Sequence, residues 1–196
     1  MWRKIGKFKF TQTKIEDVYI IEPTIFGDNR GYFLETYNQN DFQEAGLNQI
    51  FVQDNHSKST KGVLRGLHFQ YTQPQGKLVK AIKGTVYDVA VDLRKDSNTY
   101  KEYVGVVLSE ENKKMFYVPE GFAHGFLVLS DEAEFTYKCT QFYNPADEGG
   151  IIWNDPEIGI KWPLDDIKEI ILSDKDQKFK PLSETPTQFH KKGESI

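Results

Sequence analysis

Apolar and polar residues alternate with a period of two in several short stretches of this chain, and this pattern most constrains its fold. The apolar faces carry Tyr87, Val89, Val91 and Leu93 in one stretch and Phe135, Tyr137 and Cys139 in another. Successive side chains of a strand point to opposite sides of a sheet, so the alternation predicts β-strands. Strand-like runs separated by turn residues are typical of an all-β sandwich or barrel. They cover residues 17–21, 51–55, 63–70, 78–82, 85–93, 103–108, 115–118, 125–129 and 133–140.

Local signals add a hairpin, a helix and two terminal segments to this outline. Lys83-Gly84 lies between two strand-like runs and predicts a β-hairpin. A short helix is expected from Asn40, as its N-cap, to Ala45, closed by Gly46. We expect one domain over residues 1–196, with an N-terminal arm at 1–16 and a loosely held tail at 182–196.

Composition argues against several classes of protein. The 25 basic and 29 acidic residues give a net charge of −4 without a basic face, so no nucleic-acid partner is expected. No apolar run reaches the ~18 residues of a membrane-spanning helix, and the N-terminus lacks the apolar stretch of a signal peptide. Cys139 is the only cysteine. We therefore expect a soluble, cytoplasmic protein that has no membrane partner and no intrachain disulfide.

The histidine spacing argues against a metal site. Barrels of this kind often hold a metal through closely spaced histidines and a glutamate. Here no His-x-His occurs, and no carboxylate follows His68 at ligand spacing. His68 and His124 could meet in space, but two ligands make a poor site. We expect neither a metal nor a cofactor.

A group of side chains suited to proton transfer is more informative than any one of them alone. Arg65 and His68 lie in one run, Lys77 follows nine residues after His68, and Tyr137 lies on an apolar strand face. Together they supply a base, cations and an acid. Strict alternation would place Arg65 and His68 on opposite faces, so the strand must bulge or twist near Gly66 for both to reach one pocket.

Eight segments, taken in order, resemble the dTDP-4-dehydrorhamnose 3,5-epimerase family. They are Phe26–Glu35, Phe51–Ser57, Gly62–Gln70, Gln75–Val79, Val118–Leu129, Phe135–Lys138, Trp153–Pro156 and Leu172–Asp176. The resemblance covers roughly residues 17–180. It implies a cupin-type jelly-roll barrel with short flanking helices, and a homodimer. We expect the N-terminal arm around Phe8 and Phe10 to pack on the partner subunit.

The resemblance also implies roles for the residues that would act on the substrate. His68 looks like the base, oriented by Asp176, with Asp174 as the alternative partner. Tyr137 looks like the acid on the opposite face of the sugar, and Lys77 looks like the residue beside the keto oxygen.

The remaining matches are positions that bind substrate. Arg65 and His124 would contact the sugar and its phosphate, and Phe33 would lie beside the base of the nucleotide. Arg30, Glu35, Gln53, Asp54 and Asn55 match positions that hold the nucleotide, and Glu148 and Lys175 match further ligand contacts.

The implied activity is that of an isomerase. It would invert carbons 3 and 5 of dTDP-4-dehydro-6-deoxy-D-glucose through enolate intermediates, giving dTDP-4-dehydro-L-rhamnose. Inversion of a single carbon in a related dTDP-4-keto-6-deoxysugar is the alternative within the family. A non-catalytic sugar-nucleotide binding module is disfavoured by the intact His68, Lys77 and Tyr137. The missing His-x-His disfavours a metal-dependent cupin oxygenase.

Overall fold

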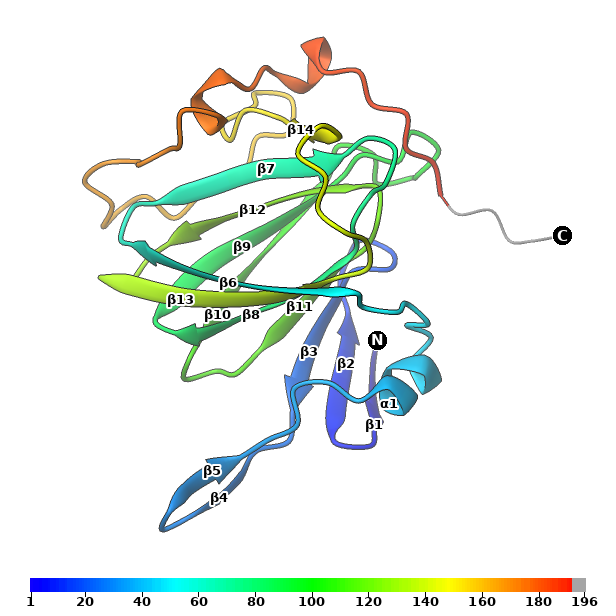
Figure 1. The fold of residues 1–196 in the computed structure, drawn as a ribbon, viewed down its shortest axis with the longest axis vertical. Helices are drawn as coiled ribbons and strands as arrows, with labels where there is room; N and C mark the ends of the chain where they lie inside the picture. The colour runs from blue at the N-terminus through cyan, green and yellow to red at the C-terminus, as the bar shows by residue number, and fades with distance from the viewer. Residues whose placement is uncertain (192–196) are drawn as a thin grey trace, which may run out of the picture.

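The computed structural model describes residues 1–191, which form two antiparallel sheets facing each other around a common interior (Figure 1). The seven-stranded sheet has the order β1 (Trp2–Ile5), β2 (Phe8–Gln12), β3 (Tyr19–Pro23), β11 (Met115–Val118), β8 (Lys77–Lys83), β13 (Glu132–Cys139) and β6 (Gln53–Thr60). The five-stranded sheet has the order β10 (Tyr103–Ser109), β9 (Thr85–Asp92), β12 (Phe122–Val128), β7 (Leu64–Gln70) and β14 (Glu148–Gly150). The predicted all-β architecture is confirmed.

Strand β9 is buried on both of its faces. Val86 and Ala90 belong to the apolar cluster inside the barrel, together with Phe135 of the opposite sheet. Val89 and Val91 point outward, into a second cluster that also contains residues of the C-terminal part, from Ile151 to Phe189. Both faces of the strand are therefore buried, and the face that also carries Asp88 and Asp92 is one of them.

The predicted hairpin at Lys83-Gly84 is wrong. Strand β8 pairs with β11 and β13, whereas β9 pairs with β10 and β12, so the dipeptide joins two different sheets. Gly84 has φ +69° and lies so close to the backbone of Glu132 that a Cβ would collide with it. A tight turn between strand-like runs fits a corner between sheets as well as a hairpin, and sequence alone did not separate them.

The N-terminal segment is part of the barrel rather than an arm. Strands β1 and β2 form a hairpin that extends the seven-stranded sheet through β3. Phe8 and Phe10 are buried in this chain, with ring centroids 5.3 and 5.2 Å from that of Phe42 in helix α1 (Gln39–Glu44). The alternation at Phe8 and Phe10 did predict a strand, but the neighbours that cover it lie in the same chain.

Helix α1 begins two residues before the expected position. Its N-cap is Asn38, whose side-chain oxygen accepts hydrogen bonds from the backbone N–H groups of Asn40 and Asp41. Gly46 follows the helix with φ +92°, as expected for the residue that ends it.

The C-terminal part packs over the outer face of the five-stranded sheet (Figure 1) and includes two short 3₁₀ helices, η1 (Asp176–Lys178) and η2 (Leu182–Glu184). The expectation of a loose tail from residue 182 is wrong as far as residue 191, because Leu182, Thr187 and Phe189 are buried. Phe189 also forms a bridge with Arg94. The rest of that tail, residues 192–196, lies outside the described residues.

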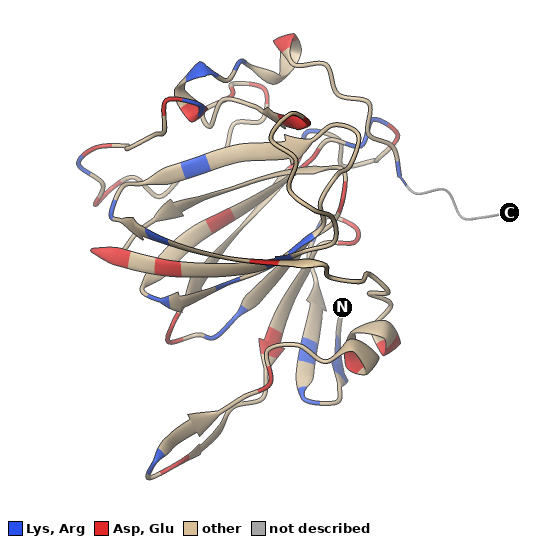
Figure 2. Cartoon of the chain, in the orientation of Figure 1, with Lys and Arg blue, Asp and Glu red and all other residues tan. Residues whose placement is uncertain are grey.

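Charges of both signs are distributed over the two sheets (Figure 2). Within residues 1–191, no helix is long and apolar enough to cross a membrane. A separate two-stranded hairpin, β4 (Phe26–Asp28) and β5 (Gly31–Phe33), projects away from the barrel (Figure 1).

Candidate active site

The two sheets enclose a pocket of about 260 Å³ that gathers most of the predicted site residues. The pocket lining includes Gln53, Asn55, Arg65, His68, Lys77, His124, Tyr137, Glu148 and Lys175. His68 lies on β7 of the five-stranded sheet, whereas Lys77 and Tyr137 lie on β8 and β13 of the seven-stranded sheet. The base and the acid implied by the family resemblance therefore approach the pocket from opposite sheets.

His68 is paired with Asp176, at the start of η1. Nε2 of His68 lies 2.6 Å from Oδ1 of Asp176, while Asp174 is exposed to solvent. Burial raises the pKa of Asp176, but the hydrogen bond and charge of His68, together with Ser173 and Lys175, outweigh it and leave that pKa below its ordinary value. An ionised carboxylate only accepts hydrogen bonds, so Nε2 carries the ring proton and Nδ1 is left as the proton acceptor.

Burial also determines the ionisation of His68. It lowers the pKa of the imidazole, and the hydrogen bond and charge of Asp176 only partly oppose this. The side chain is still 23% exposed, so it can reach a ligand in the pocket. A neutral imidazole with a carboxylate behind it is a suitable general base.

Lys77 and Tyr137 supply the cation and the acid. Burial lowers the pKa of the Lys77 ammonium, and the nearby charges of Asp88 and Glu148 oppose that shift. Burial raises the pKa of the Tyr137 hydroxyl, so it keeps its proton and can donate it. The ring of Tyr137 packs beside Phe135, with 6.0 Å between centroids, which confirms the predicted inward face of β13.

The predicted irregularity at Gly66 is confirmed. The pairing of β7 with β12 changes register between His124 and Phe126, and Gly66 has φ +108°. A Cβ at Gly66 would lie 2.6 Å from the backbone oxygen of His124. This break in the alternation lets Arg65 and His68 line the same pocket.

Glu148 and Lys175 form a charged contact at the edge of the pocket. Nζ of Lys175 lies 2.8 Å from both carboxylate oxygens of Glu148, and the hydroxyl of Tyr143 donates to Oε2 at 2.7 Å. Burial raises the pKa of Glu148, but these partners lower it further than burial raises it. Tyr143 lines the pocket, and nothing in the sequence pattern around it pointed to that position.

Sequence reasoning missed the partner of His124. Nε2 of His124 lies 2.9 and 3.0 Å from the two carboxylate oxygens of Asp88, which is fully buried. The available signal was an acidic residue within the apolar stretch around Val89. The alternation assigned Asp88 to the other face of the strand, without indicating that this face lines the interior.

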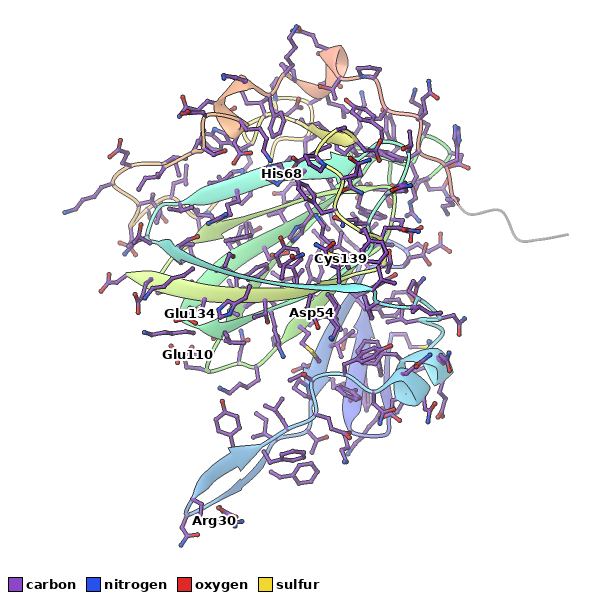
Figure 3. The ribbon with its side chains drawn as sticks, viewed as in Figure 1. Arg30, Asp54, His68, Glu110, Glu134 and Cys139 are labelled. Carbon is purple, nitrogen blue, oxygen red and sulfur yellow. The ribbon has the colours of Figure 1, made fainter. Side chains whose placement is uncertain are left out.

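Four predicted binding residues lie away from this pocket. Arg30 is at the tip of the β4–β5 hairpin, far from His68 in Figure 3, and is ion-paired with Asp28. Phe33 is 61% exposed on the same hairpin, and Glu35 pairs with Lys7. Asp54 pairs with Lys138 on the outer face of its sheet, because it alternates with Gln53 and Asn55, which line the pocket.

Within residues 1–191, no group of three or more His, Cys, Asp or Glu side chains is arranged to hold a metal ion. The histidines of the pocket are instead bound to the carboxylates of Asp176 and Asp88.

Comparisons with known proteins agree with this geometry. Residues 12–184 match the profile of a family described as dTDP-4-dehydrorhamnose 3,5-epimerase. The chain is 56% identical over 182 residues to the dTDP-4-dehydrorhamnose 3,5-epimerase of Methanothermobacter thermautotrophicus, covering 93% of this chain and 98% of the relative.

Solved structures give the same result. A dTDP-6-deoxy-D-glucose-3,5-epimerase of Legionella pneumophila, in complex with dTDP-4-keto-L-rhamnose, has 49% identity and a TM-score of 0.88, over 91% of this chain and 95% of that one. A 3'-monoepimerase of Streptomyces bikiniensis, in complex with dTDP-quinovose, has 34% identity and a TM-score of 0.81, over 87% and 86% of the two chains. The fold is thus the cupin-type barrel of these epimerases, and the chain belongs to the dTDP-4-dehydrorhamnose 3,5-epimerase family.

Proposed function

We propose that this chain inverts carbons 3 and 5 of dTDP-4-dehydro-6-deoxy-D-glucose and so forms dTDP-4-dehydro-L-rhamnose, a step in the biosynthesis of dTDP-L-rhamnose for cell-surface polysaccharides. It is an isomerase, as its relatives are. The observation that carries the proposal is the placement of His68 and Tyr137 on opposite sheets around one pocket, with Lys77 beside them. We place the reaction in the cytoplasm.

The chemistry follows from this arrangement. A proton on carbon 3 or 5 is acidic because its removal gives an enolate whose charge spreads to the oxygen at carbon 4. Nδ1 of His68 removes the proton, and Asp176 stabilises the imidazolium that forms. Lys77 stabilises the enolate oxygen, and a preorganised donor of this kind is often worth about 3 kcal/mol. Tyr137 then donates a proton to the opposite face of the carbon, which inverts the configuration.

The rest of the pocket would hold the sugar and the nucleotide. Arg65 is oriented by two hydrogen bonds to Oγ of Ser59, at 2.9 and 3.2 Å, and is suited to a phosphate group. His124 would contact the sugar from the neighbouring strand. Gln53 and Asn55 line the same pocket and would bind the nucleotide, together with Glu148 and Lys175.

We also propose a homodimer in which the β4–β5 hairpin of one subunit completes the nucleotide site of the other. Arg30 and Phe33 match nucleotide-binding positions, yet neither lines the pocket of its own chain, and Arg30 lies far from His68 (Figure 3). Phe26, Tyr32 and Phe33 of this hairpin are exposed aromatic side chains, which favour contact with a partner.

Complementation tests this arrangement. We expect His68→Ala and Arg30→Ala variants to be inactive or weak alone, and unfolding and refolding them together should form mixed dimers. One site of each mixed dimer would then combine an intact His68 with an intact Arg30. Random pairing gives about a quarter of the parental activity. An absence of recovery in mixtures shown to contain mixed dimers would place the hairpin in its own subunit's site.

Incubation with dTDP-4-dehydro-6-deoxy-D-glucose in D2O, followed by NMR, tests the activity. Deuterium at both carbons, with inversion at both, is the expected result. Deuterium and inversion at one carbon only would indicate the single-carbon alternative, the activity named for the 3'-monoepimerase to which the chain is 34% identical. No deuterium at either carbon would leave a binding module and overturn the proposal.

A further inference from the structure

Gln70 is a buried amide that lies two residues after His68 on strand β7. Its side chain is 2% exposed, and it is one of the residues that line the pocket. Residues i and i+2 of a strand share a face, so Gln70 points to the same side of β7 as His68, at the end of the strand. The mechanism above gives this side chain no role, although a buried amide is costly unless its donors and its acceptor are paired.

The polar atoms of this amide are all bound to the backbone of two loops. Nε2 donates to the carbonyl oxygen of Gln73 at 2.7 Å and to that of Phe142 at 3.2 Å, and Oε1 accepts from the backbone N–H of Asn144 at 2.8 Å. Two carbonyl oxygens face one end of the amide and an N–H group faces the other, so these contacts fix its orientation. Gln73 lies in the loop that leads from β7 to Lys77, whereas Phe142 and Asn144 lie in the loop between β13 and β14.

The two contacts with the second loop lie on either side of Tyr143, which lines the pocket. Tyr143 is 47% exposed and Phe142 is 63% exposed, so packing contributes little to holding this part of the loop. The backbone N–H of Tyr143 donates to Oε1 of Gln53 at 2.9 Å, and its hydroxyl donates to Oε2 of Glu148 at 2.7 Å. The position of Tyr143 therefore depends mainly on hydrogen bonds, and those of Gln70 hold the backbone before and after it.

These hydrogen bonds continue to the residues that we expect to bind the nucleotide. Nε2 of Gln53 donates to Oδ1 of Asn55 at 3.0 Å, and both side chains line the pocket. A displacement of the loop at Tyr143 would remove the hydrogen bond that Oε1 of Gln53 accepts. The side chain of Gln53 would then be less firmly oriented, and so would its contact with Asn55.

We propose that Gln70 is a positioning residue, which fixes the backbone on both sides of Tyr143 and thereby holds Tyr143 and Gln53 in place around the nucleotide part of the substrate. The part concerning the nucleotide rests on the proposed function. The effect on the loop does not depend on any activity.

Amide hydrogen exchange of the full chain, measured by NMR without ligand, tests the effect on the loop. Gln70→Met keeps the length of the side chain and removes its amide. Because three hydrogen bonds are lost, the loop should open more often, and the backbone N–H of Tyr143 should exchange on the order of tenfold faster. Unchanged exchange at Tyr143 in the folded variant would overturn the proposal. So would an equal rise in the amides of β9, which report on the stability of the whole barrel.

Asp147 provides a matched control at the first loop. It is also buried, and its carboxylate accepts hydrogen bonds from the backbone N–H groups of Thr72 and Gln73 and from the hydroxyl of Thr72. Asp147→Ala removes these contacts and keeps those of Gln70. It should lower thermal stability and leave exchange of the Tyr143 amide close to that of the parent protein. If it raises that exchange as far as Gln70→Met does, loosening of either loop is sufficient and the proposal fails.

The second experiment compares nucleotide binding with turnover. Calorimetry with dTDP should show an affinity on the order of tenfold weaker in Gln70→Met, and KM for the substrate should rise to a similar extent. The substitution leaves the His68–Asp176 pair intact, so kcat should change less than KM. Parental affinity for dTDP in the folded variant, or a loss confined to kcat, would contradict the proposal. If the parent protein itself does not bind dTDP, the proposed function fails, while exchange of the Tyr143 amide still decides the role of Gln70.

Gln70→Asn serves if the methionine variant does not fold. It keeps an amide but shortens the side chain by one methylene, so it cannot span both loops. The Tyr143 amide should again exchange faster than in the parent protein, and dTDP should bind more weakly. Parental values of both quantities in Gln70→Asn would count against the proposal.

Discussion

Substitution of Tyr137 by phenylalanine should separate proton removal from proton return. The change removes one hydroxyl and keeps the ring, which packs beside Phe135 on the interior face of β13. If Tyr137 is the acid, His68 can still remove a proton and return it to the same face of the sugar. The variant should therefore exchange deuterium into the substrate while forming little inverted product.

The structure sets the magnitude of each effect. Within residues 1–191, no protein group hydrogen-bonds the Tyr137 hydroxyl, which faces the pocket. Its removal should then change stability by less than the about 1 kcal/mol of a typical lost hydrogen bond, or less than about 4 °C in melting temperature. Loss of a general acid, in contrast, should lower formation of inverted product about 10²-fold or more.

The assay is NMR of the sugar in D2O, with exchange and inversion measured in the same sample. Thermal unfolding of the variant shows that it is folded. Parental rates of inversion by folded Tyr137→Phe would refute the reasoning, and a water molecule or another side chain would then be the donor.

The remaining predictions concern the base, the metal and the dimer. Asp176→Asn should slow deuterium exchange about 10²-fold or more, because it removes the carboxylate behind His68. Asp174→Asn, at an exposed position, should leave the exchange rate unchanged. Equal losses of rate in both variants would contradict the His68–Asp176 pair. Since burial lowers the pKa of His68 and the neutral ring is the active form, the rate should hold as pH falls and decline only below the ordinary value of about 6.5; a decline starting well above it would contradict this order. Full activity should survive exhaustive chelation, and loss with rescue by one divalent metal would show otherwise. Light scattering at micromolar concentration should give twice the mass of one chain, and a monomer would contradict the proposed dimer.

The strands were predictable because alternation is a local property of the sequence. Each run of apolar residues with period two forms a strand in the structure, and the inward direction of Tyr137 followed from its neighbours Phe135 and Cys139. The partners of those strands were not predictable in the same way. The turn at Gly84 looks alike whether it joins paired strands or passes from one sheet to another, and only the packing of the whole barrel decides between them.

The partners of the two pocket histidines illustrate a second limit. Asp176 is 108 positions from His68 in the chain, and its motif pointed to it only through the family resemblance. Asp88 is 36 positions from His124 and lies outside the eight segments that resemble the family. Long-range pairs of this kind depend on the register between strands, which a single sequence does not specify.

Gly66 connects local pattern to active-site geometry. A regular strand would turn Arg65 away from the pocket that His68 lines, so a catalytic site using both residues requires a break in the alternation. Glycine suits that break for two reasons. A residue with a side chain would be strained at a φ of +108°, and the backbone of His124 lies too close to leave room for a Cβ. The same break shifts the register of β12 beside it, between His124 and Phe126. One residue without a side chain thus brings Arg65 and His68 of β7 to the same pocket, next to His124 on the neighbouring strand.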